Sequence, residues 1–141
     1  MVKRVCVLIT IFLISILMVS CKKKEVKYFN DVNEFENIFN NALKYDIRNN
    51  EDCEKGHIPS FMCMGGVTDN QKLVDTILVT IKSKDKNIII ISYENDTERL
   101  NEIFELLIKN KCYNLYSFYG GYENYANLKG EEFTPEVGCD C

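Results

Sequence analysis

Four isoleucines in succession, Ile88 to Ile91, restrict the possible folds of this chain more than any other feature. Successive side chains of a β-strand point to opposite faces of the sheet, so a strand that is apolar at every position must be buried on both faces. Central strands of parallel sheets meet this condition because helices cover both sides of such sheets. The run therefore predicts a central strand in a parallel sheet.

Helical and strand-like segments alternate around this run. Three segments carry apolar residues at helical spacing: 32–42, 74–81 and 100–108. Asp31 and Glu34 form a plausible capping box before the first, and Asp96 or Thr97 is the expected N-cap of the third. Three short apolar runs are predicted strands: Leu43–Ile47, Phe61–Met64 and Leu115–Phe118. The alternation predicts an α/β fold, a single domain with a central parallel sheet and helices on both faces.

The first twenty residues follow a different pattern. Lys3 and Arg4 precede an uncharged stretch, Val5 to Val19, which as a helix would span roughly 22 Å, less than the ~30 Å of a bilayer core. These properties predict a signal peptide at 1–20 rather than a membrane-spanning helix. An uncleaved N-terminal anchor is the alternative. Under either interpretation the protein is exported and held at a membrane of the cell envelope.

The junction that follows, Met18-Val19-Ser20-Cys21, resembles the lipobox of bacterial lipoproteins, with Met18 where leucine is usual. That resemblance implies that Cys21 becomes the lipidated N-terminus. Anchoring by more than one acyl chain is stable, because each buried CH₂ contributes about 0.8 kcal/mol. Residues 21–28 would then be a polar tether between the membrane and the folded part.

Further along the chain, a strand ending in Asp-x-Arg precedes a short acidic turn and the residues Gly-His-Ile-Pro-Ser, at Tyr45–Arg48 and Glu51–Ser60. This pattern resembles the rhodanese family, in which the last residue is glycine. Cys53 stands where that family usually has an aromatic residue. The resemblance continues in two later segments, which are Ile88–Arg99 and Tyr113–Tyr122. It covers residues 29–130 and implies one rhodanese-like domain, followed by a tail, 131–141.

In active members of that family, the loop after the central strand begins with a cysteine and closes with an arginine five places later. Its backbone N–H groups stabilise a thiolate and then a persulfide anion. Here Glu94 stands at the cysteine position, and a carboxylate cannot form a persulfide. The resemblance thus implies a degenerate active loop without a catalytic residue: Glu94, Asn95, Asp96, Thr97, Glu98 and Arg99. Its carboxylates would also repel an anionic sulfur donor.

Two interpretations of Glu94 stay open. It is either a solvated loop residue on a retained scaffold, or its carboxylate accepts the N–H groups of the loop and pairs with Arg99. The resemblance favours structural roles for the other polar residues of its motifs. Asp46 and Arg48 are expected to form a buried polar brace, and His57, the only histidine, is expected in a turn beside the sheet.

Five cysteines follow Cys21: Cys53, Cys63, Cys112, Cys139 and Cys141. Cys53 and Cys112 are expected to be small buried apolar side chains, and Cys63 to be structural. Cys139 and Cys141 lie in a tail without apolar residues around them in the sequence. Four alternatives stay open for this pair: the cysteines have no role, they oxidise to a disulfide, they pair with another chain, or they hold a soft metal. Two thiolates leave a zinc site incomplete, so we predict neither a metal site nor a cofactor.

The leading hypothesis is a membrane-anchored, catalytically inactive rhodanese-like module that binds another envelope protein. One rival is a sulfurtransferase or thiol carrier that uses Cys63 or the Cys139/Cys141 pair, and a second is a metal or thiol buffer that uses the tail alone. Proximity of these cysteines to the Glu94–Arg99 loop would favour the first rival. Nucleic acid is not an expected partner, because the net charge is −4 and no basic patch is present.

Overall fold

A five-stranded sheet in the order β1-β5-β4-β2-β3 runs through the middle of the computed structural model, which describes residues 25–138. All neighbouring strands are parallel. The strands are β1 (Lys27–Phe29), β2 (Ala42–Asp46), β3 (Met62–Cys63), β4 (Asn87–Ile91) and β5 (Leu115–Phe118). The predicted parallel α/β fold is confirmed. The predicted signal peptide, Cys21, Cys139 and Cys141 lie outside the described residues.

The helices are α2 (Val32–Glu36), α3 (Asn50–Lys55), α4 (Asn70–Thr80), α5 (Thr97–Lys109) and α6 (Gly121–Lys129). Asp31 caps α2 as expected, since its carboxylate accepts the N–H of Glu34. The helix predicted over 32–42 is wrong beyond Glu36, because Phe39–Asn41 forms a short 3₁₀ turn and Ala42 starts β2. Asn40 and Asn41 are weak helix formers, and pairing of Ala42 with β4 prevails over helical spacing.

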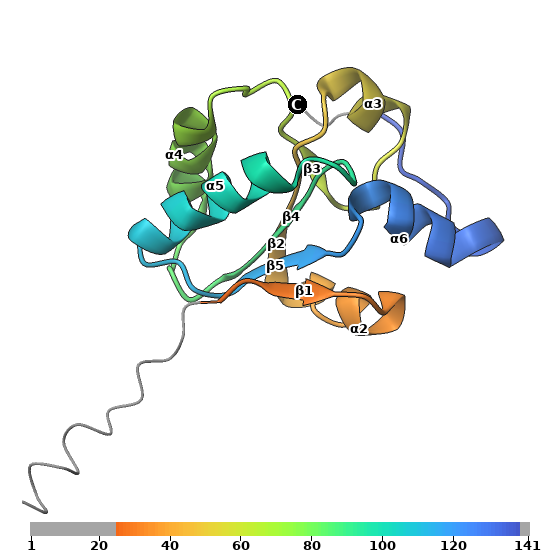
Figure 1. Ribbon diagram of the computed structural model, residues 1–141, viewed down its shortest axis with the longest axis horizontal. Helices are drawn as coiled ribbons and strands as arrows, with labels where there is room; N and C mark the ends of the chain where they lie inside the picture. The colour runs from red at the N-terminus through yellow and green to blue at the C-terminus, as the bar shows by residue number, and fades with distance from the viewer. Residues whose placement is uncertain (1–24, 139–141) are drawn as a thin grey trace, which may run out of the picture.

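Helices cover both faces of the sheet, with α4 and α5 on one and α2 and α6 on the other (Figure 1). Ile88 and Ile90 pack with apolar side chains of α4 and α5, while Ile89 and Ile91 pack in the second core with Phe35 of α2 and Tyr125 of α6. All four isoleucines are fully buried. Two residues of the predicted tether, Lys27 and Tyr28, belong to β1.

Parallel strands bring their carboxyl ends to one edge of the sheet, where the segments after β2, β3, β4 and β5 meet. Gly121, the first residue of α6, lies so close to the end of β4 that an added Cβ would stand 2.4 Å from the Ser92 carbonyl oxygen. The N–H of Tyr122 bonds that same oxygen at 3.0 Å. Over residues 25–138, no helix has the length and apolar character that crossing a membrane requires.

Gly65 and Gly66 offer a direct test of this packed edge. A Cβ on Gly65 would lie 1.6 Å from the backbone oxygen of Arg48, whereas one on Gly66 would meet only the Asn50 side chain, at 2.8 Å. We expect Gly65→Ala to lower the free energy of unfolding by about 3 kcal/mol or more, because the obstacle is backbone, and Gly66→Ala by less than about 1 kcal/mol. Urea denaturation measures both values. Similar losses in the two variants would contradict the described approach of these segments.

Candidate functional site

The loop after β4 leads from Ser92 into α5 and contains the predicted degenerate site. Glu94 is exposed, and Asp96 is the N-cap of α5 without a side-chain cap bond. The Asp96 carboxylate instead accepts the Ser92 hydroxyl at 2.5 Å. Tyr93 fixes the other end of the loop, because its hydroxyl donates to Asp52 of α3 and accepts the N–H of Asn49. The Tyr93 hydrogen bond lowers the pKa of the Asp52 carboxyl.

A carboxylate from outside the loop bonds its first N–H group. The backbone N–H of Glu94 donates to Oε2 of Glu123, an exposed residue in the first turn of α6, at 3.0 Å. Turns and helix N-termini of this kind attract anions because their N–H groups are free to donate. At Glu94, a side chain of the protein itself supplies the anion. The sequence analysis missed Glu123, since it stands 29 residues further along the chain.

Arg99 does not face Glu94. Its guanidinium donates to the carbonyl oxygens of Ile47 and Val67, each at 3.0 Å, and to Oδ1 of Asn70 at 3.1 Å. Its Nη1 also lies 4.0 Å from Oδ2 of Asp96. Arg99 thus ties the segments after β2 and β3 to the start of α5. Of the two interpretations of Glu94, the structure agrees with the solvent-exposed one.

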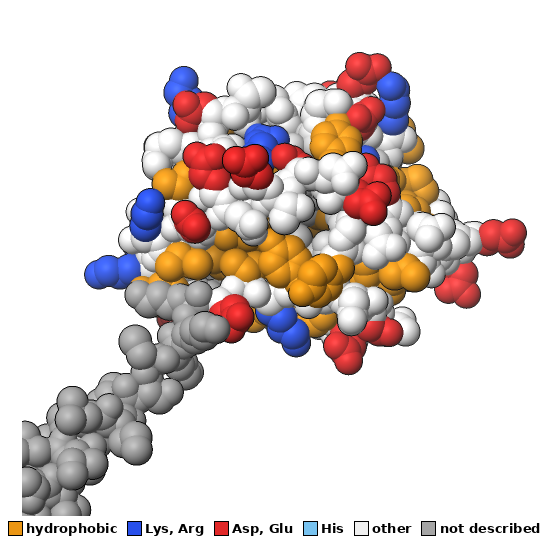
Figure 2. All heavy atoms as spheres, viewed as in Figure 1, with side chains coloured by type: hydrophobic (Ala, Val, Ile, Leu, Met, Phe, Trp, Pro, Cys, Tyr) orange, Lys and Arg blue, Asp and Glu red, His pale blue; other side chains and the backbone are white. Residues whose placement is uncertain are grey.

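A cavity of about 250 Å³ opens beside the loop, between β4 and the turn into α6. It is lined by Glu94, Thr97, Leu100, Asn101 and Phe118, by the tyrosines Tyr28, Tyr93 and Tyr119, and by the backbone around Gly120. The hydroxyl of Tyr28 donates to Asn101, and its ring lies 5.2 Å from that of Tyr119. Figure 2 shows apolar side chains gathered in a band over β1 and β5, with acidic side chains on the surface above it.

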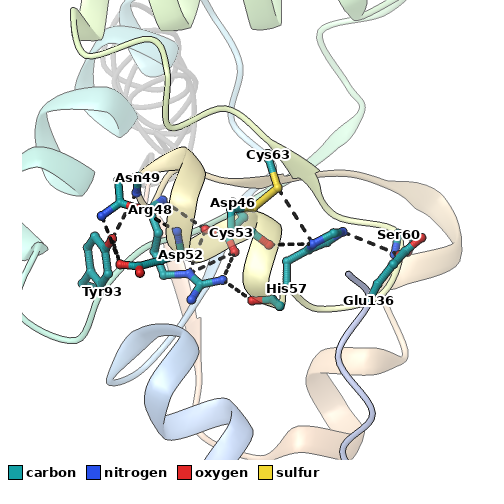
Figure 3. The surroundings of a disulfide bond; sticks show 11 residues. Asp46, Arg48, Asn49, Asp52, Cys53, His57, Ser60, Cys63, Tyr93 and Glu136 are labelled. Carbon is teal, nitrogen blue, oxygen red and sulfur yellow. Dashed lines mark hydrogen bonds and ion pairs between the residues drawn. A yellow bond between two sulfur atoms is a disulfide. The ribbon is translucent and has the colours of Figure 1, made fainter. Parts of the chain in front are cut away.

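Asp46 and Arg48 form a buried ion pair at the end of β2, with 2.6 Å between Arg48 Nη2 and Asp46 Oδ2 (Figure 3). The same Arg48 nitrogen donates to the Gly56 carbonyl oxygen at 2.8 Å. The guanidinium carbon lies 3.5 Å from the ring centroid of Tyr122. Arg48 therefore joins β2, the turn after α3 and the start of α6, and its charge faces a carboxylate rather than a free site.

His57 lies in the turn after α3, where it is buried. Its Nδ1 is 3.0 Å from the Cys53 carbonyl oxygen, and its Nε2 is 3.7 Å from Oε2 of Glu136. His57 and Glu136 also exchange two backbone hydrogen bonds of 2.9 Å, which hold the C-terminal segment against this turn. The contacts of His57 thus connect the end of α3 to the C-terminal segment, which is a structural role.

Cys53 and Cys63 form a disulfide bond that joins α3 to β3. The sequence analysis treated Cys53 as a small buried apolar residue. Its burial is correct, but its sulfur is bonded to Cys63, and this pairing was missed. The available clue was the short separation of 10 residues across the turn at Gly56–Pro59, in a chain for which export is predicted. The Cys53, His57 and Cys63 side chains offer ligand atoms within 4.8 Å of one another, a group that could hold a metal only with the disulfide reduced.

Cys112 is the free cysteine among residues 25–138, and it is buried as predicted. Burial raises the pKa of its thiol, which makes the reactive thiolate scarcer. In the described part of the chain, therefore, each cysteine is either oxidised or enclosed, and the loop at Glu94 has no cysteine of its own.

Comparison with known proteins is consistent with this geometry. A family model described as "Rhodanese-like domain" matches residues 31–128. A crystal structure of the Alr3790 protein from Anabaena sp. is similar at a TM-score of 0.60 and 18% identity, over 77% of this chain and 82% of that chain. The solution structure of the rhodanese-like domain of Alr3790 has a TM-score of 0.56 at 18% identity, over 82% and 89%. No curated protein matches the chain.

The Asp46–Arg48 pair gives a prediction for stability. Asp46→Asn keeps the shape of the side chain but leaves a buried guanidinium without its counter-charge, so we expect a loss of about 3 kcal/mol in the free energy of unfolding. Lys55→Ala is the control, because the Lys55–Glu51 pair is exposed and contributes less than about 0.5 kcal/mol. Urea denaturation compares the two. Equal, small losses would show that the buried pair is not an important brace.

Proposed function

The chain belongs to the family of rhodanese-like domains, and on that premise we propose that it is a membrane-anchored binding module without sulfurtransferase activity. One observation carries the proposal. The position in the loop after β4 that must supply the sulfur nucleophile holds Glu94, an exposed carboxylate. Sulfur transfer in this loop requires a thiolate that becomes a persulfide, and no carboxylate can substitute in that step.

The surroundings of Glu94 support the same conclusion. Glu123 accepts the backbone N–H that would otherwise stabilise a sulfur anion. The Arg99 guanidinium donates hydrogen bonds to two backbone carbonyls and to Asn70, so it connects segments of the chain instead of facing a substrate. A donor such as thiosulfate would meet the carboxylates of Glu94 and Glu123 together. At an intermediate dielectric, each close like charge costs such an anion about 1 kcal/mol or more.

The binding role is supported by the open cavity beside the loop. Its walls combine aromatic rings with the polar side chains of Ser92, Thr97 and Asn101, and binding sites commonly pair an apolar lining with such polar groups. The exposed carboxylate of Glu94 is part of its lining. This charge favours a neutral or positively charged group over an anion. The proposed partner is another protein of the cell envelope that presents such a group.

The proposed location rests on the resemblance of Met18–Cys21 to a lipobox and on the Cys53–Cys63 disulfide. Disulfides persist in oxidising compartments outside the cytoplasm, so the bond supports export. The rival sulfurtransferase that uses Cys63 gains no support, because the Cys63 sulfur is bonded to Cys53 and lies beside His57. The rival hypothesis in which Cys139 and Cys141 carry the sulfur stays a prediction, because these two cysteines lie outside residues 25–138.

Glu94→Cys tests the assignment of the loop. The new thiol has the family's position, but the Glu123 carboxylate still holds the N–H group that should stabilise its anion. We expect little transfer of sulfur from thiosulfate to cyanide by Glu94→Cys, and about fivefold more by Glu94→Cys/Glu123→Gln, which corresponds to about 1 kcal/mol of repulsion removed. Glu94→Cys/Glu105→Gln is the control, because Glu105 is an exposed residue of α5. Equal rates in the two double variants would refute the role of Glu123.

Cys21→Ser tests the anchor. If Cys21 carries the acyl chains, its replacement removes them, and the variant should leave the detergent phase in a phase-partition experiment. The unmutated, lipidated chain should stay in that phase. Cys112→Ser is a suitable control, since it removes a buried thiol of the folded domain without touching the predicted lipidation site. Unchanged partitioning of Cys21→Ser would mean that the apolar stretch 5–19 anchors the chain.

A further inference from the structure

The two residues of the Cys53–Cys63 disulfide are unequally exposed to solvent. Cys53 is fully buried in α3, with an exposed fraction of 0%. Cys63 is partly exposed and belongs to β3, the two-residue strand that is outermost in the sheet. The residue before it, Met62, is 50% exposed. This difference favours the approach of an external thiolate from the side of Cys63 over that of Cys53.

An imidazole N–H lies next to the accessible sulfur (Figure 3). His57 Nδ1 is 3.0 Å from the Cys53 carbonyl oxygen and 3.8 Å from Cys63 Sγ. Because a carbonyl oxygen only accepts hydrogen bonds, Nδ1 carries a proton. That N–H can also donate to Cys63 when its sulfur becomes a thiolate, and a donor at this place stabilises the anion.

From this arrangement we propose that Cys53–Cys63 is a thiol–disulfide exchange centre that oxidises dithiols, with Cys63 as the attacked sulfur and the buried Cys53 as the leaving group. The proposal concerns a different part of the domain from the Glu94 loop and does not depend on the binding role. A purely structural disulfide requires neither unequal access nor an imidazole N–H beside the exposed sulfur.

The exchange has two steps. One thiol of the substrate loses its proton, its sulfur bonds to Cys63 Sγ, the Cys53–Cys63 bond breaks, and Cys53 leaves as a thiolate that takes up a proton. The second thiolate of the substrate then attacks its own sulfur partner in the mixed disulfide. Cys63 leaves with the electron pair, beside the N–H of His57. In total, the substrate dithiol becomes a disulfide, and Cys53 and Cys63 take up its two electrons and two protons.

Two sources of the dithiol are compatible with this chemistry. The C-terminal segment passes directly over this turn, since the N–H of Gly138 donates to the Glu54 carbonyl oxygen at 2.9 Å and Glu136 pairs with His57. The sequence continues from Gly138 into Cys139-Asp140-Cys141, a dithiol joined covalently to this point. The other source is a dithiol on a separate protein. Both sources offer the same functional groups, a pair of thiols.

The decisive experiment compares Cys53→Ser with Cys63→Ser, each in a Cys139→Ser/Cys141→Ser background of the full chain in detergent. Each variant is treated with glutathione disulfide, and the modified residue is identified by peptide mass spectrometry. Cys63, left free by Cys53→Ser, should form the mixed disulfide at least about tenfold faster than Cys53 does in Cys63→Ser, because only Cys63 is accessible. Equal rates, or labelling of neither cysteine in the folded chain, would overturn the proposal.

His57→Phe, which keeps a ring but has no N–H group, is added to Cys53→Ser to test the imidazole. Without the N–H donor, the pH at which labelling of Cys63 reaches half its maximal rate should move upward, and an unchanged profile would remove His57 from the proposal. If the single-cysteine variants do not fold, the unmutated chain decides. An exchange centre is reduced by dithiothreitol at a rate that low urea concentrations leave unchanged, whereas a structural disulfide is reduced only as fast as the protein unfolds.

The source of the dithiol is determined by mapping disulfides in the unmutated chain. Peptides that link Cys63 to Cys139 or Cys141 would identify the tail as the substrate. If such peptides are absent while an added peptide dithiol reduces Cys53–Cys63 in the Cys139→Ser/Cys141→Ser variant, the substrate is a separate protein. If neither occurs under native conditions, the disulfide does not exchange and the proposal fails.

Discussion

Every side chain of β4 from Ile88 to Ile91 is buried, with two isoleucines against α4 and α5 and two against α2 and α6. Each contributes about 1.5–3 kcal/mol through burial, and the strand can be buried in this way only with neighbours and helices on both sides. The three layers follow from that requirement. So does the meeting of the chain segments after β2, β3, β4 and β5 at one edge, where the cavity, the buried ion pair and the degenerate loop lie.

At this edge several polar groups of the loop have hydrogen-bond partners within the protein. The carboxylate of Glu123 accepts the N–H of Glu94, Asp96 accepts the Ser92 hydroxyl, and Arg99 binds backbone carbonyls. Two donors of the loop, the Glu94 N–H and the Arg99 guanidinium, are thus bound to groups of the chain. The rhodanese-like fold is present, and under the proposed function its loop after β4 no longer serves sulfur chemistry. This pattern is consistent with binding through the adjacent cavity and is unfavourable for an anionic substrate.

The sequence was a good guide where a local pattern determined the structure. The isoleucine run, the strand at Leu115–Phe118 and the helix around Val74 were predicted correctly, since periodicity and burial agree there. Prediction from the sequence failed where contacts between residues far apart in the chain determine the structure. The helix over 32–42 ends early because Ala42 pairs with β4, and the bonds of Glu94 to Glu123 and of Cys53 to Cys63 join residues that no local pattern connects. The lipid anchor and the tail cysteines stay predictions, since they lie outside residues 25–138.

The central claim is that the loop at Glu94 cannot carry sulfur. The most direct measurement is the mass of the unmutated chain after incubation with thiosulfate, followed by treatment with cyanide, which removes persulfide sulfur. The account predicts no gain equal to one sulfur atom on any peptide of the domain, because its loop holds a carboxylate and its cysteines are bonded or buried. A cyanide-sensitive gain of one sulfur on a peptide from residues 25–138 would contradict it.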